Sequence, residues 1–147
     1  MSRFQPFARL LGMTPNHRPP DTLLAWIVLF HLVVTMLHGW AHTGAVVPVS
    51  TAANIFIFAV IIAAPLVGVS VLWFFSISVG AWLLALSLAG ALIFGVVNHF
   101  VLDSPDHVAH IVAQWRVLFG VTAVLLALSE ALGSGLAFWR AAHARMS

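Results

Sequence analysis

The feature that most constrains this chain is a series of four apolar stretches, each long enough to cross a lipid bilayer. A spanning helix needs about 20 apolar residues. The four stretches are roughly 22–44, 52–75, 78–101 and 112–139. Backbone groups inside a bilayer must be hydrogen-bonded within the protein, so isolated stretches of this length fold as helices. The sequence therefore predicts an all-α fold, an integral membrane four-helix bundle that forms a single transmembrane domain over 1–147.

The composition supports a lipid environment. Hydrophobic residues make up 62% of the chain and charged residues only 7%, whereas soluble domains carry about 25% charged residues. The small positive net charge comes from six arginines and four acids, which does not indicate a nucleic-acid partner. The absence of cysteine excludes disulfides and thiolate metal sites. We therefore expect the lipid bilayer to be the main partner.

The arginines predict the orientation of the bundle. They cluster near the two ends of the chain, at Arg3, Arg9, Arg18, Arg140 and Arg145. Positive residues favour the cytoplasmic side of a membrane, so both termini are predicted to be cytoplasmic, with 1–21 as a cytoplasmic tail. The 102–111 loop then faces the outer, periplasmic side. We expect a multi-pass protein of the inner (plasma) membrane.

Histidines form a stripe on the first predicted helix. His31, His38 and His42 fall within about 40° of one another when each residue advances the helix by 100°. The 38/42 pair has the i, i+4 spacing that lets two imidazoles bind one metal ion. Ionisable side chains in a bilayer are costly and usually face the bundle interior. This stripe is therefore a candidate metal-binding face.

The end of the third helix and the following loop add further candidate ligands at the outer face. The predicted set is His38, His42, His99, Asp103, His107 and His110. Imidazole and carboxylate suit zinc, copper or iron. Asn54, Asn98 and Arg116 lie at the same level and are candidates for contacting a bound cofactor. The competing interpretation is that His107, His110 and Asp106 are solvated loop residues.

His31 and Glu130 are predicted to lie deeper, in the inner half of the bundle. A hydrogen bond between them would join the first and fourth helices. With the outer histidines, the pair would form a proton path; alternatively, it is an interhelical tie that fixes packing. The sequence leaves both interpretations open.

These patterns support three classes of function. The first is a site for a transition metal ion or haem b, serving metal handling or electron transfer. For haem, His99 and one histidine of the first helix would be axial ligands, Arg116 would pair with a propionate, and quinone would be a natural partner. The second is a membrane-embedded enzyme acting on a lipid or quinone, with His99 and Asp103 as acid and base. The third is an accessory or structural subunit of a larger membrane complex. Whether the protein is an enzyme stays open.

Overall fold

A computed structural model describes residues 22–144, and the predicted tail 1–21 lies outside this range. The described chain consists of helices and connecting loops, without strands. Four helical segments are long and apolar enough to span a membrane: Thr22–Gly44, Thr51–Phe74, Ile77–Val101 and Ala113–His143. The predicted all-α four-helix fold is confirmed.

Two of the four segments change helix type along their length. In chain order the elements are α2 (Thr22–Gly44), α3 (Thr51–Phe56), the π-helix η1 (Ile57–Ala63), α4 (Ala64–Phe74), α5 (Ile77–Val96), the π-helix η2 (Val97–Val101), the 3₁₀ helix η3 (Val108–His110) and α6 (Ala113–His143). Ser50 and Ser76 cap α3 and α5, because each hydroxyl accepts a hydrogen bond from a free amide in the first turn. The cap at Ser76 permits the tight turn between α4 and α5.

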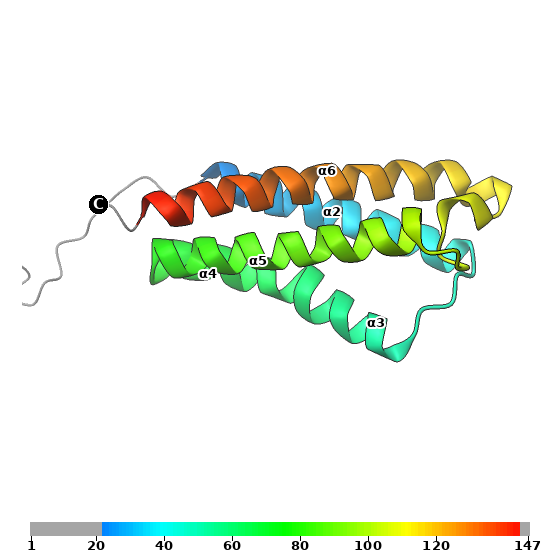
Figure 1. Ribbon diagram of the computed structural model, residues 1–147, viewed down its shortest axis with the longest axis horizontal. Coiled ribbons are helices and arrows are strands. Elements are labelled where there is room, and N and C mark those ends of the chain that lie inside the picture. The colour runs from blue at the N-terminus through cyan, green and yellow to red at the C-terminus, as the bar shows by residue number, and fades with distance from the viewer. Residues whose placement is uncertain (1–21, 145–147) are drawn as a thin grey trace, which may run out of the picture.

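The two ends of the bundle differ in content. The start of α2, the α4–α5 turn and the end of α6 lie together at one end, here called the terminal end (Figure 1). The connections 45–50 and 102–112 lie at the other, here called the histidine end (Figure 1). Both ends of the described chain therefore lie on the same side of the bundle, as an even number of spans requires.

The helices pack around two apolar clusters. α6 packs mainly against α5 and α2, and α4 packs against α5. The larger cluster lies toward the terminal end and comprises Leu24, Val28, Leu72, Ala81, Leu84, Ala85, Ala137 and Ala141. A smaller cluster of Ala41, Ile111 and Phe119 lies at the histidine end. Large side chains such as Trp26, Trp40 and Trp139 stay more than half exposed, as expected for a surface that contacts lipid.

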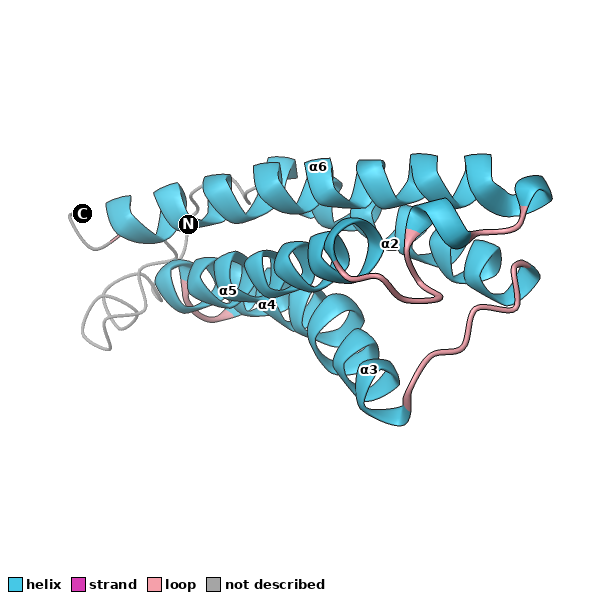
Figure 2. Cartoon of the chain, turned by 45° about the vertical axis from the view of Figure 1, so that its right-hand side comes forward, coloured by secondary structure: helices cyan, strands magenta, loops and turns pink. Residues whose placement is uncertain are grey.

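The second span bends away from the bundle. Pro65 has no N–H to donate to the carbonyl of Ile61, four residues earlier, and the π-helix η1 lies directly before it. His31 Nε2 donates to that carbonyl instead, at 3.1 Å. Proline and π-bulges are the usual causes of helix kinks. The part of this span nearer the histidine end, α3, leans away from the other helices (Figures 1 and 2), and a cavity lies beside it.

Candidate metal centre

Three imidazoles from two elements meet at the histidine end. His38 and His42 come from successive turns of α2, and His99 comes from η2. One potential ligand nitrogen from each lies within 4.8 Å of the other two. His38 and His99 are only 7% and 6% exposed, and His42 is half-buried. The structure thus brings together the three histidines that we call the histidine cluster, as helical periodicity and depth predict.

The hydrogen bonds of His38 indicate which of its nitrogens is free to bind a ligand. Nδ1 lies 2.8 Å from the hydroxyl of Thr122. That hydroxyl donates to the carbonyl of Leu118, at 2.7 Å, and so accepts a hydrogen bond from Nδ1–H. A neutral imidazole protonated at Nδ1 carries its lone pair on Nε2.

His99 is oriented in the same way by the loop. Its Nδ1 donates to the backbone carbonyl of Asp106, at 3.2 Å, because a carbonyl can only accept. The lone pair of His99 is then on Nε2, which lies 3.1 Å from Nε2 of His38. With both tautomers set in this way, two lone pairs face each other across a buried gap. A cation between the two nitrogens removes the repulsion of their lone pairs. A proton on Nε2 of His38 does the same, and the Thr122 hydroxyl then donates to Nδ1 of His38.

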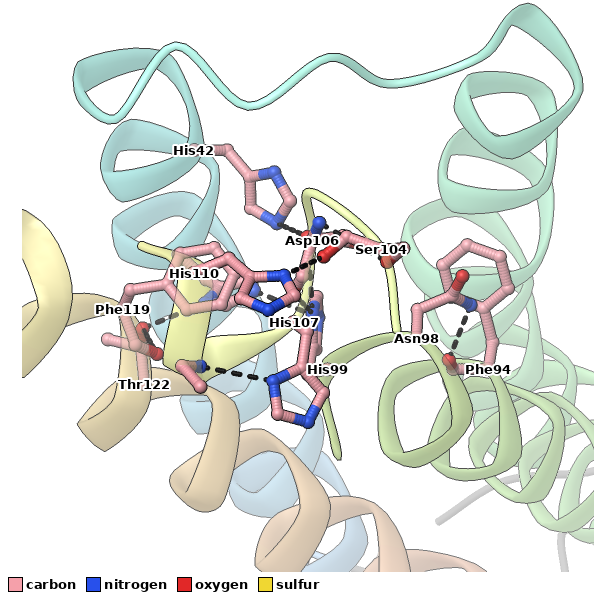
Figure 3. Close-up of polar contacts among 12 residues, drawn as sticks. His42, Phe94, Asn98, His99, Ser104, Asp106, His107, His110, Phe119 and Thr122 are labelled. Atoms are coloured by element: carbon pink, nitrogen blue, oxygen red, sulfur yellow. Dashed lines mark hydrogen bonds and ion pairs between the residues drawn. The ribbon is translucent and has the colours of Figure 1, made fainter. Parts of the chain in front are cut away.

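Asp106 lies beside this pair. Its Oδ1 is 3.2 Å from His42 Nε2 and 3.3 Å from His99 Nδ1 (Figure 3). Neither contact meets the angular requirement of a strong hydrogen bond, since Oδ1 has no hydrogen-bond partner within residues 22–144. The interaction is therefore mainly one of charge. Facing a carboxylate, His42 is expected to carry its proton on Nε2, and its buried Nδ1 has no hydrogen-bond partner in the described chain.

The electrostatics of the cluster keep Asp106 ionised. Burial favours the neutral form of its carboxyl, but the electrostatic influence of the nearby imidazoles, first of His99 and then of His42 and His38, outweighs burial and lowers the pKa of Asp106 below its ordinary value. A carboxylate next to imidazole N–H groups is the arrangement that orients metal-binding histidines in proteins.

An aromatic ring seals the cluster on the side of α6. The Phe119 ring centroid lies 4.6 Å from that of His38, 4.8 Å from His42 and 5.2 Å from His99. Phe119 is fully buried. The ring therefore excludes water from this side and leaves the opposite side as the route of access.

On that side is a cavity of about 440 Å³ that extends from the histidine cluster to Glu130. Residues of α2, α3, η1, α5, η2 and α6 line it, and α3 forms its outer wall. Asn98 and Asn54 also line it, but the amide of each donates to a backbone carbonyl, of Phe94 and Val49 respectively. The cavity gives the cluster an open side.

The other predicted ligands lie apart from the cluster. Asp103 and His110 form an exposed pair, with Oδ1 and Nε2 3.3 Å apart, and His107 accepts a hydrogen bond from the amide of Ala109. Arg116 is exposed and donates to the carbonyl of Ile111. The three-residue group that the structure brings to ligand distance is His38, His42 and His99. Asp103, His107 and His110 are not part of it.

Sequence reasoning missed the position of Asp106, which it treated as a solvated loop residue. The loop folds back after η2, so that the backbone carbonyl and the side chain of Asp106 both face His99. Pro105 signals a break in the helix, but the direction of the return depends on tertiary contacts.

The structure also brings His31 and Glu130 close together. His31 Nδ1 and Glu130 Oε1 are 3.6 Å apart, and both side chains are buried. This distance is longer than a hydrogen bond. The contact lies between α2 and α6, farther from the histidine end than the histidine cluster. Comparison with known proteins adds no assignment, since no protein-family model, curated protein or solved structure matches the chain.

Proposed function

We propose that this protein binds a divalent transition-metal ion within the membrane, at the histidine cluster, and handles that ion at the outer face of the bilayer. The ligands are Nε2 of His38, Nε2 of His99 and the unpartnered Nδ1 of His42. Imidazole ligands without thiolate suit zinc, copper, iron or nickel.

The observation that carries the proposal is the 3.1 Å separation between the two Nε2 atoms of His38 and His99. Two nitrogens bound to one tetrahedral zinc ion at about 2.0–2.1 Å lie roughly 3.3 Å apart. The pair is therefore already near the required spacing, with its lone pairs converging. One ring nitrogen of His42 lies within 4.8 Å of the ligand nitrogens of the other two histidines, so a shift of up to about 1.5 Å brings it to the spacing of ligands on one ion.

The surroundings of the ligands support metal binding over simple packing. Metal-binding histidines usually donate their second N–H to a carboxylate, a backbone carbonyl or a similar acceptor. Here Thr122 accepts from His38 and the Asp106 carbonyl accepts from His99, while the Asp106 carboxylate lies 3.2 Å from His42 Nε2. A purely structural histidine contact has no need for all three rings to be held in this way.

A bare ion fits the cluster better than haem b. The ring centroids of His38 and His99 are 4.8 Å apart, and those of His42 and Phe119 lie within 5.6 Å of both rings. The space around the facing nitrogens is thus occupied by other rings, which leaves little room for a flat macrocycle between axial ligands.

Three protein ligands leave a fourth position for water, Asp106 or an incoming group. Three-histidine sites with an open position are typical of metals that exchange ligands. The cavity beside the cluster supplies space for such exchange. This favours handling of the ion over a permanently closed structural site.

The test is metal analysis and an absorption spectrum of the detergent-purified protein after incubation with Zn²⁺, Cu²⁺ or Fe²⁺. We expect about one ion per chain, lost in the double variant His38→Ala/His42→Ala because one ligand cannot hold the ion. The matched control is His107→Ala/His110→Ala, which removes two histidines of the loop and should keep the ion.

Each outcome decides between the candidate functions. A wild-type protein that binds no metal overturns the proposal and favours an accessory subunit. Loss of metal in the loop control would move the site to the 102–112 segment. A haem spectrum would replace the bare ion with a porphyrin.

A further inference from the structure

His31 and Glu130 are the remaining ionisable residues buried in the described bundle. His31 is 0% exposed and Glu130 is 3% exposed. Neither belongs to the histidine cluster, which lies seven residues farther along α2, a rise of about 10 Å. The proposed metal site therefore gives no reason for this pair.

The protonation of His31 follows from Pro65. His31 Nε2 lies 3.1 Å from the carbonyl of Ile61, which Pro65 leaves without its usual helical donor. A carbonyl only accepts hydrogen bonds, so Nε2 carries a proton. In a neutral His31, Nδ1 is then an acceptor. It is buried and without a hydrogen-bond partner in the described part of the chain, and it faces Glu130 Oε1 at 3.6 Å.

A proton on the Glu130 carboxyl makes the contact between Oε1 and His31 Nδ1 favourable. A deprotonated Glu130 would place a carboxylate oxygen against the lone pair of Nδ1, which is repulsive, and would leave a charge buried in apolar surroundings. A protonated Glu130 can donate to Nδ1, and both buried groups are then satisfied without net charge. An ion pair of the same composition would place two charges in the membrane interior, which is costly.

Glu130 and the histidine cluster line the same cavity. The titratable side chains lining the cavity are His38, His42, His99 and Asp106 at the histidine end and Glu130 at the other. Between them, the wall is formed by residues such as Thr35, Ile61 and Leu126. The cavity is thus the route by which a proton on Glu130 can exchange.

We propose that His31 and Glu130 form a proton-binding site at the inner end of this cavity, and that Glu130 releases its proton when a divalent cation occupies the histidine cluster. The coupling in this proposal rests on the proposed metal site. A divalent cation about 10 Å away in a poorly screened interior favours the carboxylate over the neutral acid. Thermodynamic linkage is reciprocal, so the proton at Glu130 weakens metal binding by the same factor.

The proton-binding site differs from an interhelical tie in a way that one variant can separate. Glu130→Gln preserves the tie, because the amide NH₂ can donate to His31 Nδ1, but it cannot bind or release the proton. A variant that loses folding would be recognised by its circular dichroism, and Glu130→Gln is chosen because it retains both the size of the side chain and the ability to donate to His31 Nδ1.

The experiment combines infrared spectroscopy of the carboxyl group with Zn²⁺ binding at several pH values. We expect a protonated-carboxyl band at neutral pH that is absent in Glu130→Gln and disappears when Zn²⁺ is added to the wild type. The slope of log Kd against pH gives the number of protons released per bound ion. We expect this number to be smaller by about one in Glu130→Gln, at unchanged Zn²⁺ stoichiometry. A wild-type protein without this band, or an unchanged slope in the variant, overturns the inference. If Zn²⁺ does not bind at all, the proposed function and the coupling fail, and the band in the metal-free protein still decides whether the proton site exists.

Discussion

At the scale of single residues, the protein places imidazoles so that their outer contacts determine which nitrogen faces inward. Thr122 and the Asp106 carbonyl each engage an Nδ1, and two Nε2 atoms are left facing each other. Three histidines of this site could be predicted, because 38 and 42 share a helix face and 99 lies at the same depth. Their acceptors could not be predicted, because Thr122 is distant in sequence from His38, and Asp106 reaches His99 only through the return of the loop after η2.

The Thr122 hydroxyl gives a prediction at this scale. Thr122→Val keeps the shape of the side chain but removes the acceptor for His38 Nδ1–H, so the tautomer that presents Nε2 is no longer favoured. We expect the affinity for Zn²⁺ to fall by about 10–100-fold, as for other groups that orient metal ligands. Competition with a chelating dye measures the change.

Ser134→Ala is the matched control for this variant. It removes another hydroxyl of α6, one that donates to the carbonyl of Ala131, and should leave the affinity as in the wild type. Equal affinities for Thr122→Val and the wild type would mean that Thr122 does not position His38.

At the scale of elements, the site depends on two interruptions of regular helix. The π-helix η1 and Pro65 direct α3 away from the bundle and free the carbonyl that His31 binds. The π-helix η2 carries His99 to the cluster. Apolar length predicts the four helices and most of their limits within a few residues, although α6 continues to His143 beyond the expected end near 139.

The interruptions themselves are harder to predict. Proline marks a weak point in the second span, but the lean of α3 depends on which neighbour satisfies Ile61. The π-helices have no residue signature of their own, and the donor that reaches the Ile61 carbonyl in η1 comes from another helix, at His31. The cavity follows from these features and so could not be predicted from hydrophobicity.

At the scale of the whole molecule, the arrangement places the ionisable groups along one side of the bundle interior. The histidine cluster, the cavity and the His31–Glu130 pair follow one another from the histidine end toward the middle of the span. The even number of spans places the two described ends on one side of the membrane, and the arginines near the chain ends favour the cytoplasmic side. We therefore propose that the histidine end faces outward.

Cysteine labelling tests this orientation without background, since the chain has no cysteine. Asp103→Cys lies in the loop of the histidine end, where the native side chain is 93% exposed. Phe75→Cys lies in the α4–α5 turn, where the native residue is 84% exposed. We expect a membrane-impermeant maleimide to label Asp103→Cys in intact cells and Phe75→Cys only after permeabilisation. The reverse pattern would place the histidine cluster on the cytoplasmic side.

The most direct test of the metal centre is zinc K-edge X-ray absorption of the purified protein loaded with one equivalent of Zn²⁺. The arrangement of His38, His42 and His99 predicts three imidazole nitrogens at about 2.0–2.1 Å and one oxygen ligand. In His99→Ala the imidazole contribution should fall by one or the zinc should be lost. A spectrum with oxygen ligands alone, or one unchanged in His99→Ala, would contradict a metal centre at the histidine cluster.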